Sequence, residues 1–262
     1  MTLSIYIPTY RRTGRQITWG FLPKSVREHT TLVCPADEAD ALRRATGGRV
    51  LVQPPHVKTI AAKRQWIVDQ CDTEQLCMLD DDLRFSVRDP VAGRGTNEDA
   101  GGCALNKVGP RDVERMFSEM SDQLTQYAHA GVSMRMGNQS RPPGWHTCKR
   151  MVYVLAYDVA TLRRWARFDE IAHREDMMVT LRLLQAGFAN VVSYEFTADQ
   201  VYASKGGESA AGRDMEASNE DACRLAATFP GLVRVTSKAY KVSTVRQEVV
   251  VQWNKAWNKA LS

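Results

Sequence analysis

Several common signatures are missing from this chain of 262 residues. No apolar run approaches the roughly 20 residues that span a bilayer, and the opening stretch MTLSIYIPTYRR has neither a basic lead nor a cleavage site. The six cysteines form no Cys-x-x-Cys pair, and the histidines show no His-x-His or His-x₃-His spacing. We therefore expect no signal peptide, membrane span, disulfide framework or Cys/His zinc site, and a cytoplasmic protein.

The composition is ordinary for a folded globular protein. Hydrophobic residues make up 44% and charged residues 25% of the chain, which excludes a disordered polymer. The formal net charge of +5 permits a polyanionic partner without requiring one. No internal repeat and no clean linker divides the sequence, so we expect a single domain over residues 1–262.

Strand-like and helix-like patterns alternate in the first third of the chain. Compact β-branched runs lie at residues 3–10, 30–34, 49–55 and 74–79, and helix-like segments lie between them at 36–46 and 57–72. Gly47 and Gly48 close the first of these helices. This order is typical of right-handed βαβ units, and it predicts an α/β fold with a mostly parallel central sheet flanked by helices.

Long polar stretches interrupt this rhythm later in the chain. Residues 88–110 are rich in glycine and too long for an ordinary connection, so we expect a mobile functional loop there. Residues 138–150 are expected to be irregular, and residues 204–214 form a further Gly-rich loop. Helical spacing resumes at 113–127 and 175–187, and strands are expected at 131–137 and 190–196.

Three consecutive acids, Asp80, Asp81 and Asp82, follow the fourth expected strand. In open α/β sheets, ligands bind beyond the carboxyl ends of the strands, and hard divalent cations prefer carboxylate oxygens. In an extended segment, Asp80 and Asp82 point to one side and Asp81 to the other. The triplet therefore indicates a metal and phosphate site, with a solvated turn or a helix cap as the alternative.

A second acidic pair, Glu175 and Asp176, opens the amphipathic segment EDMMVTLRLLQAG. Acids in a first turn are favoured by the helix dipole, so N-terminal capping alone explains the pair. The pair gains a catalytic interpretation only from its order in the chain, after a first strand with a polar loop and after the triplet.

In this order of motifs the sequence resembles the nucleotide-sugar-dependent glycosyltransferases of the GT-A fold, over roughly residues 3–190. The resemblance implies a nucleoside-diphosphate sugar as donor, expected to be a UDP-sugar, and a divalent metal, Mn²⁺ or Mg²⁺. It assigns Asp80 and Asp82 to the metal, and Asp80 and Asp81 to the donor. Asp176 would be the general base of an inverting transfer, and Glu175 would hydrogen-bond the acceptor or fix the helix start.

The same resemblance divides the chain and adds donor contacts. Residues 1–85 form the donor-binding half, 110–200 the acceptor and catalytic half, and 201–262 the C-terminal loop and tail. The expected contacts lie in the loop after the first strand, in the second helix and in the late Gly-rich loop: Pro8, Thr9, Tyr10, Arg11, Lys63, Arg64, Lys205 and Arg213. A solvated helix face for Lys63 and Arg64, and a plain surface turn for Lys205 and Arg213, are the alternatives.

The stretches PTYRR, HREDMMVTLRLLQAGF and GGESAAGRD resemble the small phage glycosyltransferases associated with TET-type oxygenases. That resemblance implies transfer of a hexose to hydroxymethylcytosine in double-stranded DNA, in the cytosol of a phage-infected cell. The target base must leave the stack, and the expected DNA contacts are aromatic or cationic: Arg141, Trp145, His146, Lys149 and Arg174. For Trp253 and Trp257, docking on the domain is the simpler interpretation.

Three other functions fit parts of the sequence. A glycosyltransferase with a saccharide, lipid or protein acceptor has the same motifs, because the fold does not select the acceptor. A non-catalytic nucleic-acid-binding module accounts for the basic stretches but leaves the acid triplet unexplained. A metal-dependent phosphohydrolase also clusters acids, although it usually brings more His and Asp ligands than this chain offers.

Overall fold

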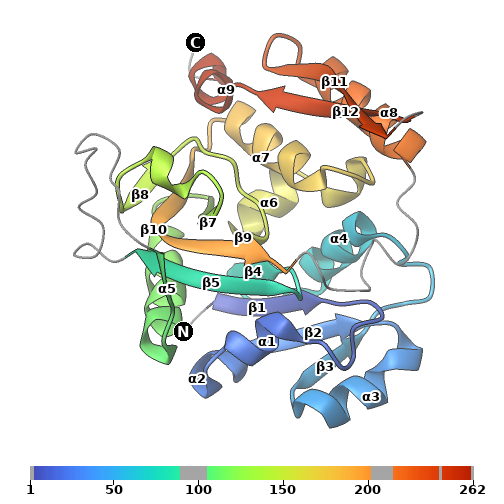
Figure 1. The fold of residues 1–262 in the computed structure, drawn as a ribbon, viewed down its shortest axis with the longest axis vertical. Coiled ribbons are helices and arrows are strands. Elements are labelled where there is room, and N and C mark those ends of the chain that lie inside the picture. Colours follow the sequence, from blue (N-terminus) through green and yellow to red (C-terminus); the bar gives the residue numbers. More distant parts are fainter. Residues whose placement is uncertain (1–2, 89–104, 202–214, 242–243, 261–262) are drawn as a thin grey trace.

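The computed structural model describes residues 3–88, 105–201, 215–241 and 244–260 (Figure 1). Its strands are β1 (Leu3–Pro8), β2 (Thr30–Cys34), β3 (Arg49–Val52), β4 (Gln75–Leu79), β5 (Leu83–Arg88), β6 (Leu105–Lys107), β7 (His129–Met134), β8 (Trp145–Thr147), β9 (Val154–Asp158), β10 (Asn190–Gln200), β11 (Val233–Lys241) and β12 (Thr244–Val251). Its helices are α1 (Ile17–Phe21), α2 (Lys24–Arg27), α3 (Ala36–Thr46), α4 (Ile60–Gln70), α5 (Pro110–Gln123), α6 (Val159–Trp165), α7 (Glu175–Gln185), α8 (Met215–Thr228) and α9 (Trp253–Ala260). Two short 3₁₀ helices are η2 (Asn138–Ser140) and η3 (Phe168–Glu170).

Four parallel strands form the first half of the central sheet, in the order β3-β2-β1-β4. β1, β2 and β4 are almost wholly buried, which is why their sequences are continuous apolar runs. α3 ends at Gly47, whose φ of 65° is the left-handed conformation that closes a helix. α4 begins after Thr59, whose hydroxyl accepts a hydrogen bond from the Ala62 amide at 3.1 Å. The predicted βαβ order is confirmed in this half.

The second half of the sheet contains antiparallel strands. β9 lies antiparallel between β4 and β7, so β4 and β7 run in the same direction. β10 is parallel to β7 and antiparallel to both β8 and β5. A register shift between Ser193 and Thr197 divides β10 into a part beside β8 and a part beside β5. β8 lies in the stretch expected to be irregular, and the long loop expected at 88–110 falls mostly outside the described residues.

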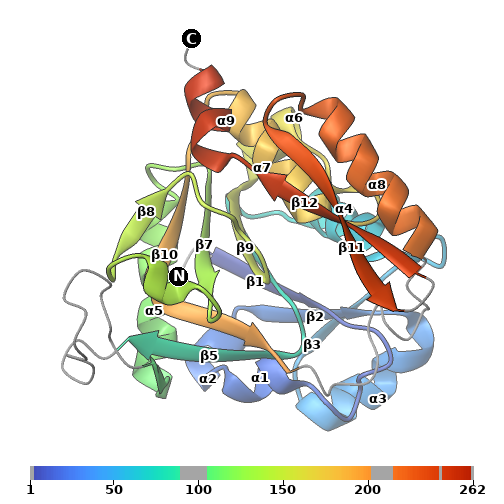
Figure 2. The same cartoon turned by 45° about the horizontal axis from the view of Figure 1, so that its top comes forward.

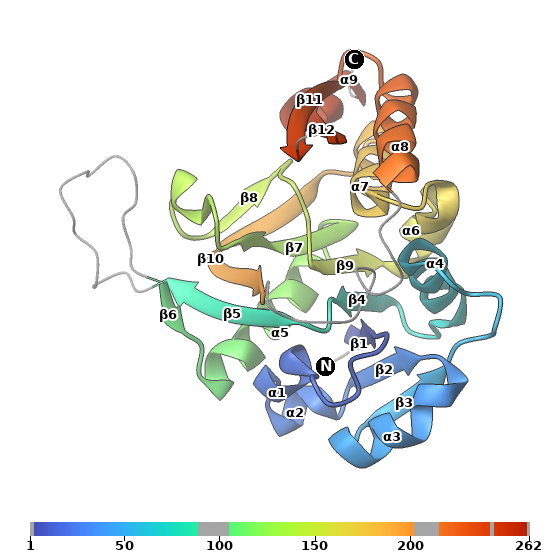
Figure 3. The same cartoon turned by 45° about the vertical axis from the view of Figure 1, so that its right-hand side comes forward.

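Helices cover both faces of this sheet (Figure 3). On one face, apolar side chains of α1, α2, α3 and α5 pack into a first core cluster with β1, β2 and β4. On the other face, α4, α6 and α7 pack into a second cluster with the same sheet. Each strand alternates its side chains between the two faces. The predicted α/β fold, a central sheet with helices on both faces, is confirmed.

The C-terminal elements pack on the outer side of α7. A third cluster joins α7 to α8, to the β11–β12 hairpin and to α9 (Figure 2). α7 is therefore buried on both sides, which explains why its sequence is apolar almost all round. Trp253 and Trp257 of α9 lie against this cluster, as the docking interpretation predicts. Among the described residues, no helix is long and apolar enough to cross a membrane.

A fully buried histidine in the second core makes the stability of the fold depend on pH. His129 stacks against Tyr157, and its Nε2 lies 3.0 Å from the carbonyl oxygen of Phe188. Burial lowers the pKa of His129 to about 4. Its pKa in the unfolded chain is about 6.5, so protonation favours the unfolded state as the pH falls between these values.

We predict that His129 lowers the free energy of unfolding by roughly 3 kcal/mol when the pH falls from 7 to 4. Urea unfolding at several pH values should show that His129→Gln loses less stability than wild type over this range. The exposed His56→Gln is the matched control and should keep the wild-type dependence. Equal pH dependence in wild type and His129→Gln would contradict the prediction.

Candidate active site

The acid triplet forms the turn between β4 and β5, at the carboxyl edge of the sheet. Thr18 of α1 holds this turn: its hydroxyl donates to the Asp80 carbonyl at 2.5 Å and accepts from the Leu83 amide at 2.8 Å. The Thr18 amide donates to the Asp81 carbonyl at 3.1 Å. The segment is a turn and not the extended strand from which the alternation of these three side chains was expected. Instead, Asp81 and Asp82 share one cation and Asp80 faces another.

The shared cation is Arg12, from the loop after β1. Its guanidinium forms ion pairs with Asp81 and with Asp82, the latter at 3.1 Å, and all three side chains are buried. Asp81 also accepts a hydrogen bond from the Thr9 hydroxyl at 2.6 Å. Burial raises the pKa of Asp81, and Arg12 and Thr9 partly oppose that shift. These contacts tie the loop after β1 to the turn after β4.

The second cation is Arg64, and it connects the two acidic motifs. One nitrogen of its guanidinium pairs with Asp80 at 2.6 Å, and the other pairs with Glu175 at the start of α7. Burial would lower the pKa of Arg64, but the carboxylates of Glu175, Asp80 and Asp176 outweigh it and raise that pKa. The triplet and the acidic pair therefore belong to one site, although they come from opposite halves of the chain.

The two acids of α7 have different surroundings. Glu175 is buried and held by Arg64, whereas the side chain of Asp176 is only partly buried. Asp176 lies close enough to contribute to the pKa values of Asp80, Arg64 and Tyr157. The N-cap residue of α7 is Arg174, which makes no side-chain cap, and both acids lie in the first turn of the helix. Asp176 is thus the more accessible carboxylate of the pair.

Negative charge exceeds positive charge around Asp80. Burial raises the pKa of Asp80 to about 6; Arg64 lowers it, and the neighbouring Asp82, Asp81 and Asp176 raise it again. The other Asp80 oxygen accepts a hydrogen bond from the Gln200 side chain at 3.0 Å. In the described parts of the chain, no three His, Cys, Asp or Glu side chains are grouped as a complete metal shell. A site of this kind suits a divalent cation that takes one or two carboxylates and completes its shell with phosphate oxygens and water.

The loop after β1 was predicted to contact the donor, and the structure gives several of its residues internal partners. Pro8 ends β1, and the Arg11 amide donates to both carboxylate oxygens of Glu38. The Arg11 guanidinium lies over the Tyr10 ring, 5.0 Å from its centroid. Tyr10 and Arg11 remain at least partly exposed and keep their predicted role as a proposal.

The helix residues Lys63 and Arg64 are buried, so the solvated-face alternative is wrong for both. Lys63 Nζ donates to the Thr9 carbonyl at 2.7 Å, and burial lowers the pKa of Lys63 to about 8. Lys63 therefore holds the loop after β1, and Arg64 holds the acids of the site. Lys205 and Arg213 lie outside the described residues.

The predicted DNA contacts fall into two groups. Arg141, Lys149 and His146 are at least partly exposed around β8, although the His146 ring packs edge-on against Tyr194. Trp145 packs against the first core cluster and its indole N–H donates to Glu119 at 3.2 Å, so it has a structural role that the sequence did not predict.

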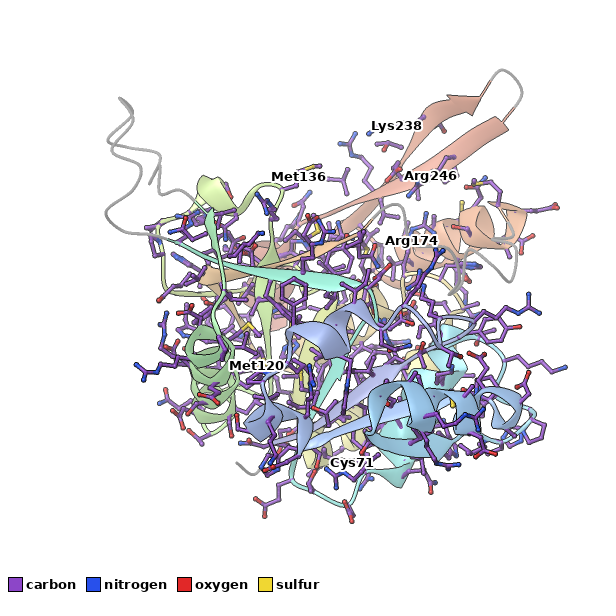
Figure 4. All side chains as sticks on the ribbon, turned by 60° about the horizontal axis from the view of Figure 1, so that its bottom comes forward. Cys71, Met120, Met136, Arg174, Lys238 and Arg246 are labelled. Carbon is purple, nitrogen blue, oxygen red and sulfur yellow. The ribbon has the colours of Figure 1, made fainter. Side chains whose placement is uncertain are left out.

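Arg174 also has an internal role. It is the residue before α7, and its guanidinium donates to Ser218 of α8 and, at 2.7 Å, to the Gln247 carbonyl of β12 (Figure 4). Asp221 of α8 accepts hydrogen bonds from the Ala172 and His173 amides at 3.1 and 2.8 Å. The C-terminal elements thus fix the start of the helix that bears Asp176.

Four residues of the site had no signal strong enough to be found in the sequence: Arg12 as an acid partner, Thr18, Gln200 and Asp221. Arg12 was visible only as one cation in a polar loop, and the other three are isolated polar residues. Only the three-dimensional fold brings Gln200, at the end of β10, next to Asp80.

Solved structures of other proteins share this fold. TarS of S. aureus (residues 1–349) in complex with UDP-GlcNAc superposes with a TM-score of 0.52 and 13% identity, over 86% of this chain and 67% of that chain. Glucosyl-3-phosphoglycerate synthase from Mycobacterium tuberculosis, in complex with Mn²⁺, UDP and glucosyl-3-phosphoglycerate, superposes with a TM-score of 0.53 and 9% identity, over 95% of this chain and 87% of that chain. In another TarS 1–349 structure, the match spans 60% of that chain. At these identities the likeness concerns the fold.

No curated protein sequence is similar enough to this chain to count as a match. The family comparison is positive, because residues 3–207, which include β1, the acid triplet and α7, match the model of one enzyme family. The chain therefore belongs to the TET-associated glycosyltransferases.

Proposed function

We propose that this protein is a metal-dependent, inverting glycosyltransferase that moves a hexose from a nucleoside-diphosphate sugar, most simply a UDP-sugar, to the hydroxymethyl group of hydroxymethylcytosine in DNA. The observation that carries the proposal is Arg64, which pairs with Asp80 and with Glu175 and so places the triplet and the α7 acids in one site. The cytosol of a phage-infected cell is the corresponding location.

The grouping of acidic side chains supports the proposed binding of a metal and a nucleotide-sugar donor. Asp80 and Asp82 are the residues that would hold Mn²⁺ or Mg²⁺, because their carboxylates belong to one turn with Asp81 and the two cations Arg12 and Arg64 face four acids there, Asp80, Asp81, Asp82 and Glu175. The metal would supply positive charge to a departing diphosphate. Both TarS with UDP-GlcNAc and the Mn²⁺-containing glucosyl-3-phosphoglycerate synthase have this fold, which supports a nucleotide-sugar donor. Thr9, Tyr10 and Arg11 lie in the loop expected to meet the nucleotide.

The acceptor side depends on Asp176. A hydroxymethyl oxygen attacks efficiently only when a carboxylate within hydrogen-bond reach removes its proton. Arg64 already holds Glu175, so Asp176 is the carboxylate available to an acceptor, and Glu175 has the role of orienting Arg64 and the helix start.

DNA as the acceptor is supported by the family and by nearby cations. Three residues separate Lys149 from Tyr153, and the Tyr153 carbonyl accepts a hydrogen bond from the Asp80 amide at 3.1 Å. The four Cα steps span at most about 14 Å and the hydrogen-bonded pair adds about 5 Å, so the Cα atom of Lys149 is within roughly 20 Å of that of Asp80. Burial and the charge of Arg141 lower the pKa of Lys149, which shows that these two cations are neighbours. Such a pair suits the phosphates that flank an extruded base.

Replacing Asp176 by Asn keeps its size and removes its basicity. We predict that Asp176→Asn binds the donor as wild type does but transfers sugar at least about 100-fold more slowly. Each protein is incubated with a panel of nucleotide sugars, Mn²⁺ and duplex DNA with or without hydroxymethylcytosine, and the nucleosides are analysed by mass spectrometry. The exposed Asp169→Asn is the control and should retain transfer. Transfer by Asp176→Asn at the native rate would refute the base assignment.

Donor binding tests the triplet. Asp82→Ala should abolish the rise in melting temperature that a UDP-sugar plus Mn²⁺ gives wild type, because a ligand stabilises only the state that binds it. Each protein is compared with its own ligand-free melting temperature, since Asp82 also pairs with Arg12. EDTA should remove the rise in wild type, and an unchanged rise in Asp82→Ala would exclude this residue from the donor site.

The bridging arginine should be as important for stability as for activity. Arg64→Met leaves Glu175 and Asp80 without their buried cation, so we predict a loss of about 3–5 kcal/mol in the free energy of unfolding. The double variant Arg64→Met/Glu175→Gln should recover part of that loss, because one buried charge is removed with its partner. Urea unfolding measures both. A loss below about 1 kcal/mol in the single variant would show that Arg64 does not hold the two acids together.

A further inference from the structure

The β11–β12 hairpin has one face that the core does not cover. Register pairs Val233 with Val251 and Val235 with Val249, and side chains of this set pack toward α8 and the third core cluster. The alternate positions form the opposite face, because successive strand residues point to opposite sides. This face pairs Arg234 with Val250, Thr236 with Glu248, and Lys238 with Arg246. We call Arg234, Lys238 and Arg246 the basic face.

The basic face places like charges together. Lys238 lies directly opposite Arg246 in the ladder, an arrangement that weakens an antiparallel pair. Arg246 pairs with Glu248 of the same face at 3.0 Å, so one acid offsets one of the three cations. Among the residues that the structure describes, neither Lys238 nor Arg234 is in an ion pair, and both are exposed. An anionic ligand would turn this unfavourable arrangement into a favourable one.

The hairpin is attached directly to the active-site helix. Gln247, the neighbour of Arg246, accepts a hydrogen bond from Arg174 through its carbonyl and donates through its amide to Asn219 of α8 at 2.8 Å. Arg174 is two residues before Asp176. In Figure 4, Lys238 and Arg246 lie toward the upper edge of the molecule and Arg174 lies below them. The basic face is therefore positioned by the same contacts that position the proposed base.

We propose that the basic face binds the sugar-phosphate backbone of duplex DNA while a base of that duplex enters the active site. From Arg234 to Lys238 the strand advances about 13 Å, a length over which duplex DNA carries about eight phosphates. The hairpin follows residue 207, where the family match ends, so nothing in that match assigns it a role. The inference rests on the proposed function for the identity of the polyanion.

The test is the salt dependence of DNA binding by the full-length protein. Affinity for a hydroxymethylated duplex and an unmodified duplex is measured by fluorescence anisotropy between 50 and 200 mM salt, for wild type and Lys238→Ala/Arg246→Ala. Loss of two phosphate contacts should weaken binding of the variant to both duplexes. Between 50 and 200 mM salt, the factor by which affinity decreases should be about 12 times smaller in the variant than in wild type. The donor-induced rise in melting temperature of the variant checks that its fold is intact.

The matched control removes the same charge elsewhere. Arg43→Ala/Arg44→Ala changes two exposed arginines of α3, at the opposite end of the molecule from the hairpin (Figure 1), and should bind DNA with the wild-type salt dependence. If the hairpin variant binds both duplexes as wild type does, the inference is overturned, even when wild type glycosylates DNA. If wild type binds DNA through the hairpin but transfers no sugar to it, the proposed acceptor is wrong and the inference stands.

Discussion

The active site depends on one buried guanidinium. Arg64 contacts Asp80 after β4 and Glu175 at the start of α7, and these are the segments that must meet if donor and acceptor are to react. A buried carboxylate without a cation is costly, so the three side chains stabilise one another only in this arrangement. Arginine suits the position because its planar group donates to two acids at once, which a lysine ammonium cannot do with the same geometry.

The remaining contacts extend this arrangement outward. Arg12 binds Asp81 and Asp82 and so attaches the loop after β1 to the same turn. On the other side, Arg174 and Asp221 connect the start of α7 to the C-terminal elements. The site is therefore held by ion pairs and hydrogen bonds between segments that are distant in the sequence. Arg12, Lys63 and Arg64 each offset part of the negative charge of the site, and in the proposed function a divalent metal would offset the remainder.

The sequence was most informative where local pattern and burial agree. The four strands up to residue 79 and the helices α3 and α4 could be predicted because buried parallel strands and their crossover helices leave clear periodicities, whereas the short α1 and α2 were missed. The antiparallel β9 and the divided β10 could not, because strand direction and register are set by contacts across the sheet. The hairpin β11–β12 was likewise missed, although its alternating pattern is visible once the register is known.

At the candidate site, the sequence indicated which residue types come together but not which partners they have. The acid triplet and the α7 pair were found, but their cation partners were not, because Asp80 pairs with Arg64 whereas Asp81 and Asp82 pair with Arg12. Lys63 and Arg64 were expected to meet phosphate, and the structure buries them beneath the site. The partner of Trp145 could not be predicted either, because its hydrogen bond to Glu119 forms only when the fold brings β8 next to α5.

A crystal structure of the protein with Mn²⁺ and a UDP-sugar tests the central claim most directly. We expect a cation coordinated by Asp80 or Asp82 and by the diphosphate, with the sugar carbon facing Asp176 and Arg64 still joining Asp80 to Glu175. A diphosphate bound away from the triplet, or a sugar that lies on the far side of the triplet from Asp176, would contradict the central claim.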